Sequence, residues 1–124
     1  MEPKKKVVFF EPGEGEMFRL KGVDIEQLLA REHCSQFSAY RVCMRPHEEK
    51  KLSYHQSGEE LYYVLSGEGM AFLGGDEYRL KGGCFFRVPP QTLHQFKTAD
   101  HSLEMLNFHS PPVFANHDTY FPKD

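Results

Sequence analysis

The chain of 124 residues contains no tryptophan and only three cysteines, and its 18 acidic side chains nearly balance its 15 Lys and Arg. The basic residues are scattered apart from Lys4–Lys6, so the sequence shows no basic surface of the kind that binds nucleic acid. The longest apolar runs, such as Val7–Phe10, are far shorter than the roughly 20 residues that cross a bilayer. We therefore expect no nucleic-acid or membrane partner. Because no secretory signal follows the start, we also expect a cytoplasmic location.

The cysteines, Cys34, Cys43 and Cys84, show no CxxC or other paired spacing. Because their number is odd, they cannot complete a disulfide framework. We expect reduced thiols that are mostly buried. Cys84 opens an expected strand, where packing accounts for it.

The abundant residues favour strands and tight turns. Phe and Tyr make up 14% of the chain, alongside 10 Gly and 8 Pro. Short apolar or alternating segments are separated by turn residues, among them Gly67–Gly69, which predicts an all-β protein and does not fit parallel βαβ units. The size suits one domain, residues 1–124. The expected strands are Val7–Phe10, Ser38–Met44, Glu60–Leu65, Met70–Leu73, Glu77–Leu80, Cys84–Val88, His94–Phe96 and Leu103–His109.

Two segments do not follow the short alternating pattern of the expected strands. Residues 23–31 fit a helix, with Asp24 and Gln27 as a possible capping box, and helical propensity alone narrowly favours it; an edge strand is the alternative. The tail 111–124 begins with two prolines and contains three aromatic residues. It indicates an irregular strap packed against the body of the domain.

Two polar clusters carry the residues suited to chemistry. The first, Pro46–Gly69, contains His55 and Glu60, and the second, Gly83–Phe96, contains His94. Both faces of the strand expected over 60–65 are largely apolar, so the Glu60 carboxylate should be buried and should need a cation or a tight hydrogen-bonding partner. Two histidines with one carboxylate are the ligand set of non-haem iron sites.

The first cluster resembles the first signature motif of the cupins, which are small double-stranded β-barrels. That motif reads G(X)5HXH(X)3,4E(X)6G. Laid on this chain from position 47 to Gly67, it makes His55 the second histidine and Glu60 the glutamate. The spacing fits throughout.

The second cluster is similar to the second cupin motif, G(X)5PXG(X)2H(X)3N, at Gly83, Pro89 and His94. The resemblance covers about residues 38–108. It implies an all-β double-stranded β-helix, the cupin jelly-roll barrel, with N-terminal strands in 6–31 and a C-terminal strap over 110–124. It favours a strand for 23–31. It also implies a homodimer that exchanges or pairs edge strands, for which Val7–Phe10 is a candidate cover.

Four positions depart from the family motifs. His47 and Gln91 stand where the motifs have glycine, and Thr98 replaces an asparagine. Ser53 stands where the first histidine ligand belongs, which leaves His55, Glu60 and His94 as the metal ligands that the resemblance implies, with water at the fourth corner. The open position could serve catalysis, or it could mark a site that has lost its metal.

The resemblance implies a divalent transition metal, Fe, Mn, Ni or Zn, in a barrel pocket that binds a small organic molecule. A dioxygenase or an isomerase is the expected activity. The alternative is a non-catalytic small-molecule-binding or sensor cupin without tightly bound metal.

Further side chains near the motifs have two interpretations each. Tyr62 would point into the barrel beside Glu60, where it could orient a ligand or donate a proton as a catalytic residue, or simply line the core. His109 could reach the pocket as a replacement ligand or general base, although a solvated strand end is the favoured interpretation. His47 is expected to be an exposed loop residue. Glu60 could pair with Lys50 or Arg87 instead of a metal, and Glu59 could compete for the ligand role.

Overall fold

The computed structural model describes residues 7–20, 22–30, 32–112 and 118–122. These residues contain strands and no helix, and thus no helix long and apolar enough to cross a membrane. The strands are β1 (Glu16–Leu20), β2 (Val23–Leu29), β3 (Ser38–Met44), β4 (Tyr54–His55), β5 (Glu59–Leu73), β6 (Asp76–Lys81), β7 (Phe85–Val88), β8 (His94–Lys97), β9 (Leu103–Ser110) and β10 (Thr119–Tyr120).

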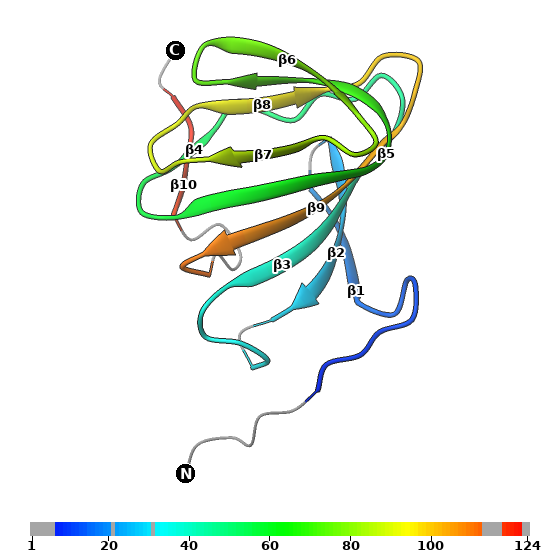
Figure 1. Cartoon of the computed structure of the whole chain (residues 1–124), viewed down its shortest axis with the longest axis vertical. Helices are drawn as coiled ribbons and strands as arrows, with labels where there is room; N and C mark the ends of the chain where they lie inside the picture. Colours follow the sequence, from blue (N-terminus) through cyan, green and yellow to red (C-terminus); the bar gives the residue numbers. More distant parts are fainter. Residues whose placement is uncertain (1–6, 21, 31, 113–117, 123–124) are drawn as a thin grey trace.

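The strands form an antiparallel barrel, and β5 in its wall pairs with four other strands, while β4 and β10 form a separate two-stranded sheet (Figure 1). The main sheet has the order β1-β2-β3-β9-β5-β6, and β7 and β8 also pair with β5. The first half of β5 pairs with β7 and β9, whereas its second half pairs with β6 and β8, so the strand belongs to both walls of the barrel. The expected all-β jelly-roll fold is confirmed.

The alternation of β5 separates the barrel interior from the outer surface. Glu60, Tyr62 and Val64 are buried, whereas the intervening Leu61 and Tyr63 are 38% and 46% exposed. The expectation that both faces of this segment are buried is therefore wrong. The outward face is apolar in composition, but no other part of the described chain covers it.

Gly67–Gly69 does not form the expected turn, because β5 runs through it. A Cβ atom at Gly67 would lie 1.9 Å from the carbonyl oxygen of Ser102, and the backbone there has a φ of +89°. Glycine is thus required because the β8–β9 loop approaches the strand closely and because the left-handed conformation is costly for other residues. The two shorter strands expected over 60–73 are one continuous strand.

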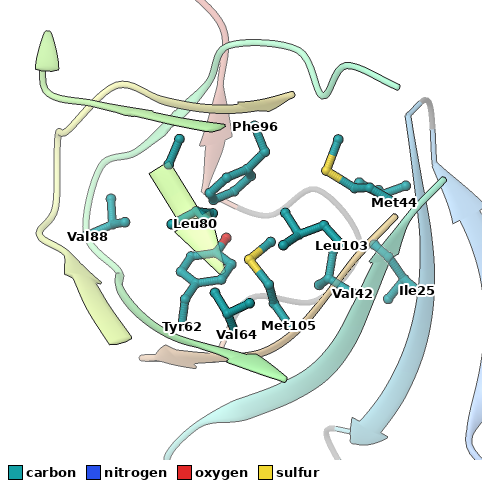
Figure 2. Close-up of a cluster of buried hydrophobic side chains, with 12 residues drawn as sticks. Ile25, Val42, Met44, Tyr62, Val64, Leu80, Val88, Phe96, Leu103 and Met105 are labelled. Atoms are coloured by element: carbon teal, nitrogen blue, oxygen red, sulfur yellow. The ribbon is translucent and has the colours of Figure 1, made fainter. Parts of the chain in front are cut away.

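The hydrophobic core fills the space between the two walls (Figure 2). Tyr62 stacks on Phe86 with ring centroids 4.8 Å apart and meets Phe96 edge-on at 5.1 Å. Val64 and Met105 are fully buried beside them. This packing fixes the face of β5 that also carries Glu60.

The flanking segments correct part of the expected pattern. Residues 23–29 are strand β2, as the family resemblance favoured, but β2 lies between β1 and β3 rather than at an edge. Val7–Phe10 is in no strand, since an apolar aromatic run becomes a strand only where a partner accepts its hydrogen bonds. In the tail, Thr119–Tyr120 pairs with β4, and residues 113–117 and 123–124 lie outside the described part of the chain.

Candidate metal centre

The three residues singled out by motif spacing converge inside the barrel. The Nε2 atom of His94 lies 3.0 Å from Oε2 of Glu60, and Nε2 of His55 lies 3.3 Å from the same oxygen. All three side chains are buried, and the two imidazole rings lie 5.2 Å apart. Residues 39 positions apart in the sequence thus share one carboxylate oxygen as a neighbour.

Backbone pairing brings these side chains together. Ser53 and His94 exchange two backbone hydrogen bonds, of 3.1 and 2.8 Å, which fasten the strand carrying His55 to β8. Glu60 lies near the start of β5, where its register partners are Val88 in β7 and His109 in β9. Three different strands, β4, β5 and β8, therefore contribute to one point in the interior.

The hydrogen bonds of the two imidazoles define which nitrogen carries a proton. Nδ1 of His55 lies 2.9 Å from the carbonyl oxygen of Asp118, and Nδ1 of His94 lies 3.1 Å from that of Thr92. A carbonyl oxygen only accepts, so both Nδ1 atoms must donate. In the neutral tautomer each Nε2 then presents a lone pair to the Glu60 carboxylate, an arrangement that requires a proton or a metal cation between them.

Unsatisfied atoms mark the same point. Oε2 of Glu60 and Nε2 of His94 are buried and have no hydrogen-bond partner within the described residues. Such atoms are costly in a protein interior unless an ion or a proton compensates them. The donor set, two imidazole nitrogens and a carboxylate oxygen, fits a divalent transition metal.

His109 is a further member of the centre and corrects the favoured expectation of a solvated strand end. It is only 6% exposed, and its Nε2 lies 2.7 Å from Oε1 of Glu60. Ligand atoms of His55, Glu60 and His109 all lie within 4.8 Å of one another. The alternation of β9 could have revealed the burial of His109, because every second residue of this strand is buried: Leu103, Met105, Asn107 and His109.

Two neutral donors hold the other carboxylate oxygen of Glu60. The Tyr62 hydroxyl donates to Oε1 at 2.8 Å, and Nδ2 of Asn107 donates to it at 3.3 Å. Burial, together with the charge of Glu60, raises the pKa of Tyr62 well above its usual range, so its hydroxyl remains a donor. Because Oε1 is held in this way, Oε2 is the oxygen left to meet a cation.

The histidines determine the charge of Glu60. Burial by itself would raise the pKa of this carboxyl, but the surrounding imidazoles, His109 foremost, outweigh burial and hold the pKa well below its ordinary value. Burial lowers the pKa of His55, yet the nearby Glu60 carboxylate raises the pKa above the usual value overall. The centre therefore favours an ionised carboxylate that attracts positive charge.

The corner of the missing histidine is occupied by a hydroxyl and a lysine. Ser53 is fully buried, and its Oγ accepts a hydrogen bond of 3.2 Å from Nζ of Lys50. Burial lowers the pKa of Lys50, while the charge of Glu60 opposes this effect. Glu59 and Arg87, the other acid and base considered beside Glu60, instead pair with each other at 2.6 Å, away from the centre.

The segment at Asp118 fastens the turn between His55 and Glu60. Its carboxylate accepts backbone hydrogen bonds from the turn, at 3.0 Å from Gln56 and 2.8 Å from Gly58, while its carbonyl oxygen accepts from His55. Asp118 has a φ of +62°, a conformation that Asp tolerates better than most residues. Sequence reasoning missed this role, because nothing in the tail indicates which turn it meets.

The remaining departures from the motifs have structural explanations. His47 and Gln91 have φ values of +61° and +65°, the left-handed region that explains why the family motif has glycine at both positions. His47 is an exposed turn residue, as expected. Thr98 receives the Glu48 N–H and donates to the Arg45 carbonyl, which ties the loop before β4 to the end of β8. Cys84, a free thiol, packs against the core.

Comparison with known sequences identifies a matching family and two relatives that are similar to part of the chain. A model of the cupin domain matches residues 40–109. An uncharacterized protein of Methanocaldococcus jannaschii is 32% identical over 68 residues, which cover 55% of this chain and 54% of that protein. Quercetin 2,3-dioxygenase of Bacillus subtilis is 31% identical over 61 residues, 49% of this chain and 18% of that enzyme. The chain thus spans about half of the first relative and under a fifth of the second.

Solved structures show the same fold. A Streptomyces Pac13 variant with uridine superposes with a TM-score of 0.79 at 20% identity, over 95% of this chain and 92% of that chain. Pac13 is described as a nucleoside dehydratase. The family model covers more than half of the present chain and includes His55, Glu60 and His94. The chain therefore belongs to the cupin family.

Proposed function

We propose that the protein is a metal-binding cupin in which His55, Glu60 and His94 hold a divalent transition metal. The observation that carries this proposal is the pair of Nε2 atoms directed at one oxygen of Glu60, with both Nδ1 protons donated to carbonyl groups. His109 is a fourth candidate ligand, since one ring nitrogen of His109, one of His55 and a carboxylate oxygen of Glu60 lie within 4.8 Å of one another.

The donor set is compatible with Fe, Mn, Ni or Zn. A metal held there would polarise a carbonyl or enolate of a small organic molecule, or activate oxygen beside it. The partial similarity to quercetin 2,3-dioxygenase supports oxygen chemistry, and the likeness to Pac13 supports a small-molecule ligand in the barrel. A dioxygenase or an isomerase is the activity we propose, with Tyr62 as the residue that orients Glu60.

Elemental analysis of untagged protein, purified without added metal, tests the centre. We expect about one equivalent of metal in the wild type and a large loss in Glu60→Ala and His94→Ala. His101→Ala is the matched control, because His101 is an exposed histidine that pairs with Glu68 away from the barrel interior. Ser53→His should tighten metal binding. Less than about a tenth of an equivalent in the wild type would overturn the proposal.

A second candidate function is a metal-free small-molecule binder. Two features favour it. Ser53 replaces one of the family's metal ligands, and the Lys50 ammonium interacts electrostatically with the Glu60 carboxylate without any metal. Turnover screens under air and under nitrogen, after extraction of bound metabolites, distinguish the two candidates. Turnover that depends on added metal supports the enzyme, whereas a tightly retained metabolite in metal-free protein supports the binder.

We also infer a homodimer. Exposed apolar side chains lie on the outward face of β5 and β7, and Val7 and Phe9 of the segment before β1 are 92% and 78% exposed. Large apolar side chains left in water are costly, and a second copy of the chain could cover them. Light scattering coupled to gel filtration measures the mass. A species with the mass of one chain, 14.4 kDa, would contradict the dimer.

A further inference from the structure

A lysine side chain lies beside the candidate centre without an acidic partner. The Lys50 ammonium donates a hydrogen bond to Ser53 Oγ at 3.2 Å. Within the described residues no carboxylate lies within ion-pair distance of it, although the charge of Glu60 acts on it from further away. Lysine heads are usually left in water. A lysine placed here costs free energy that a purely structural contact to one hydroxyl does not repay.

The charges around this corner do not balance once a metal is bound. Glu60 supplies one negative charge and Lys50 one positive charge, so a divalent cation would leave two positive charges uncompensated. Glu26, the other buried acid among the described residues, pairs with Arg41 at 2.7 Å and accepts from the Gly15 N–H, and is therefore committed elsewhere. In a poorly solvated interior this imbalance favours a ligand that brings negative charge.

The position of the lysine indicates where such a ligand binds. Ser53 stands at the place that the first motif histidine would take, so Lys50 adjoins the coordination position that this chain leaves to a ligand. The Ser53 hydroxyl can rotate to accept from Lys50 and donate to an oxygen anion. A carboxylate has two oxygens, of which one can meet the metal and the other the ammonium.

We propose that Lys50 and Ser53 form an anion-binding corner, and that the ligand of the pocket is a small organic acid bound through its carboxylate. This inference rests on the proposed metal centre and adds the substrate class to it. Lys50 is a specificity-determining residue in this scheme. If Lys50 merely offset the charge of Glu60, its removal would leave the preference between charged and neutral ligands unchanged.

The test uses Co²⁺-loaded full-length protein and the visible absorption of cobalt, which reports ligand binding without any assay of activity. Glycolate is the anionic probe, and glycolamide is its neutral analogue of similar size. We expect glycolate to perturb the spectrum at much lower concentration than glycolamide. Lys50→Met should raise the half-saturating glycolate concentration by about tenfold or more, as expected for loss of one charge-assisted hydrogen bond, and should abolish the preference over glycolamide.

Lys51→Met is the matched control, because Lys51 is an exposed neighbour whose Nζ lies over the Phe121 ring at 4.5 Å. It should bind glycolate like the wild type. Lys50→Met should bind Co²⁺ at least as tightly as the wild type, because a positive charge beside the cation is removed. Should that variant fold poorly, Lys50→Gln tests the same charge.

The outcomes separate this inference from the metal centre. A wild type that takes up Co²⁺ but responds equally to glycolate and glycolamide would overturn the anion corner and leave the centre intact. An unchanged glycolate response in the Lys50 variants would do the same. A wild type that takes up no Co²⁺ would overturn both.

Discussion

Replacement of Asp118 by Ala should loosen the candidate centre without altering any of its ligands. The Asp118 carboxylate accepts N–H groups from Gln56 at 3.0 Å, Ser57 at 2.9 Å and Gly58 at 2.8 Å, and its carbonyl oxygen accepts from His55. Burial raises the pKa of Asp118, but these N–H donors outweigh burial and lower the pKa overall, so the group is ionised at neutral pH.

The expected effect follows from these contacts. A hydrogen bond to a charged group contributes about 1.5–3 kcal/mol, but water can replace part of the set at this half-buried turn, so we expect a total loss of about 1–3 kcal/mol in the free energy of unfolding. Metal affinity should fall by about 10- to 100-fold, because the acceptor that fixes the His55 tautomer is no longer anchored.

Urea unfolding of chelator-treated protein measures the first effect, and Zn²⁺ competition with a chromophoric chelator measures the second. Asp118→Asn keeps an acceptor and tolerates the left-handed backbone, so it should be milder. Asp118→Gly suits the φ of +62° but supplies no acceptor, so it separates the backbone conformation from the hydrogen bonds. Wild-type Zn²⁺ affinity in both the Ala and the Gly variant would refute the reasoning.

Three further predictions concern the barrel itself. Gly67→Ala should destabilise the protein by about 3 kcal/mol or more, measured by urea unfolding, because its Cβ would lie 1.9 Å from the Ser102 carbonyl; a loss under about 1 kcal/mol would contradict the close approach. His47→Gly should stabilise it by about 0.5–1 kcal/mol by relieving a left-handed backbone, and a lower melting temperature would argue against that strain. Burial raises the pKa of Glu26, but hydrogen bonds from Arg41 and a backbone N–H lower it below its ordinary 4.5. Stability from Glu26 is therefore complete above pH 4.5 and lost as pH falls through the folded pKa, so Glu26→Gln should flatten this part of the stability profile; identical profiles would exclude the effect.

The motif spacing predicts three side chains, His55, Glu60 and His94, that the fold brings together, because a β-barrel converts fixed separations along the chain into fixed positions in space. The position of His109 two residues before Pro111 predicts a solvated strand end, although the alternation of Leu103–His109 places it on the buried face. Alternation gives the face of a residue, but not how far into the interior the strand continues.

Other features depend on partners that local sequence does not reveal. Val7–Phe10 has the composition of a strand, yet nothing pairs with it within the described residues. Gly67 resembles a turn residue because the same backbone freedom serves a turn and a close approach. Lys50 and Asp118 contact the centre from loops, and their roles follow only from the three-dimensional arrangement.

The continuity of β5 has a consequence for how readily its backbone opens. Because β5 is paired with four other strands, its amide hydrogens should exchange only when the whole protein unfolds, and Glu60 cannot swing outward on that side. β4 is much shorter: it pairs with β10 at two positions, His55 with Thr119 and Tyr54 with Tyr120, and Ser53 beside it forms a single bridge to His94. The amide hydrogens of this short ladder should therefore exchange sooner than those of β5, which hydrogen exchange can measure strand by strand.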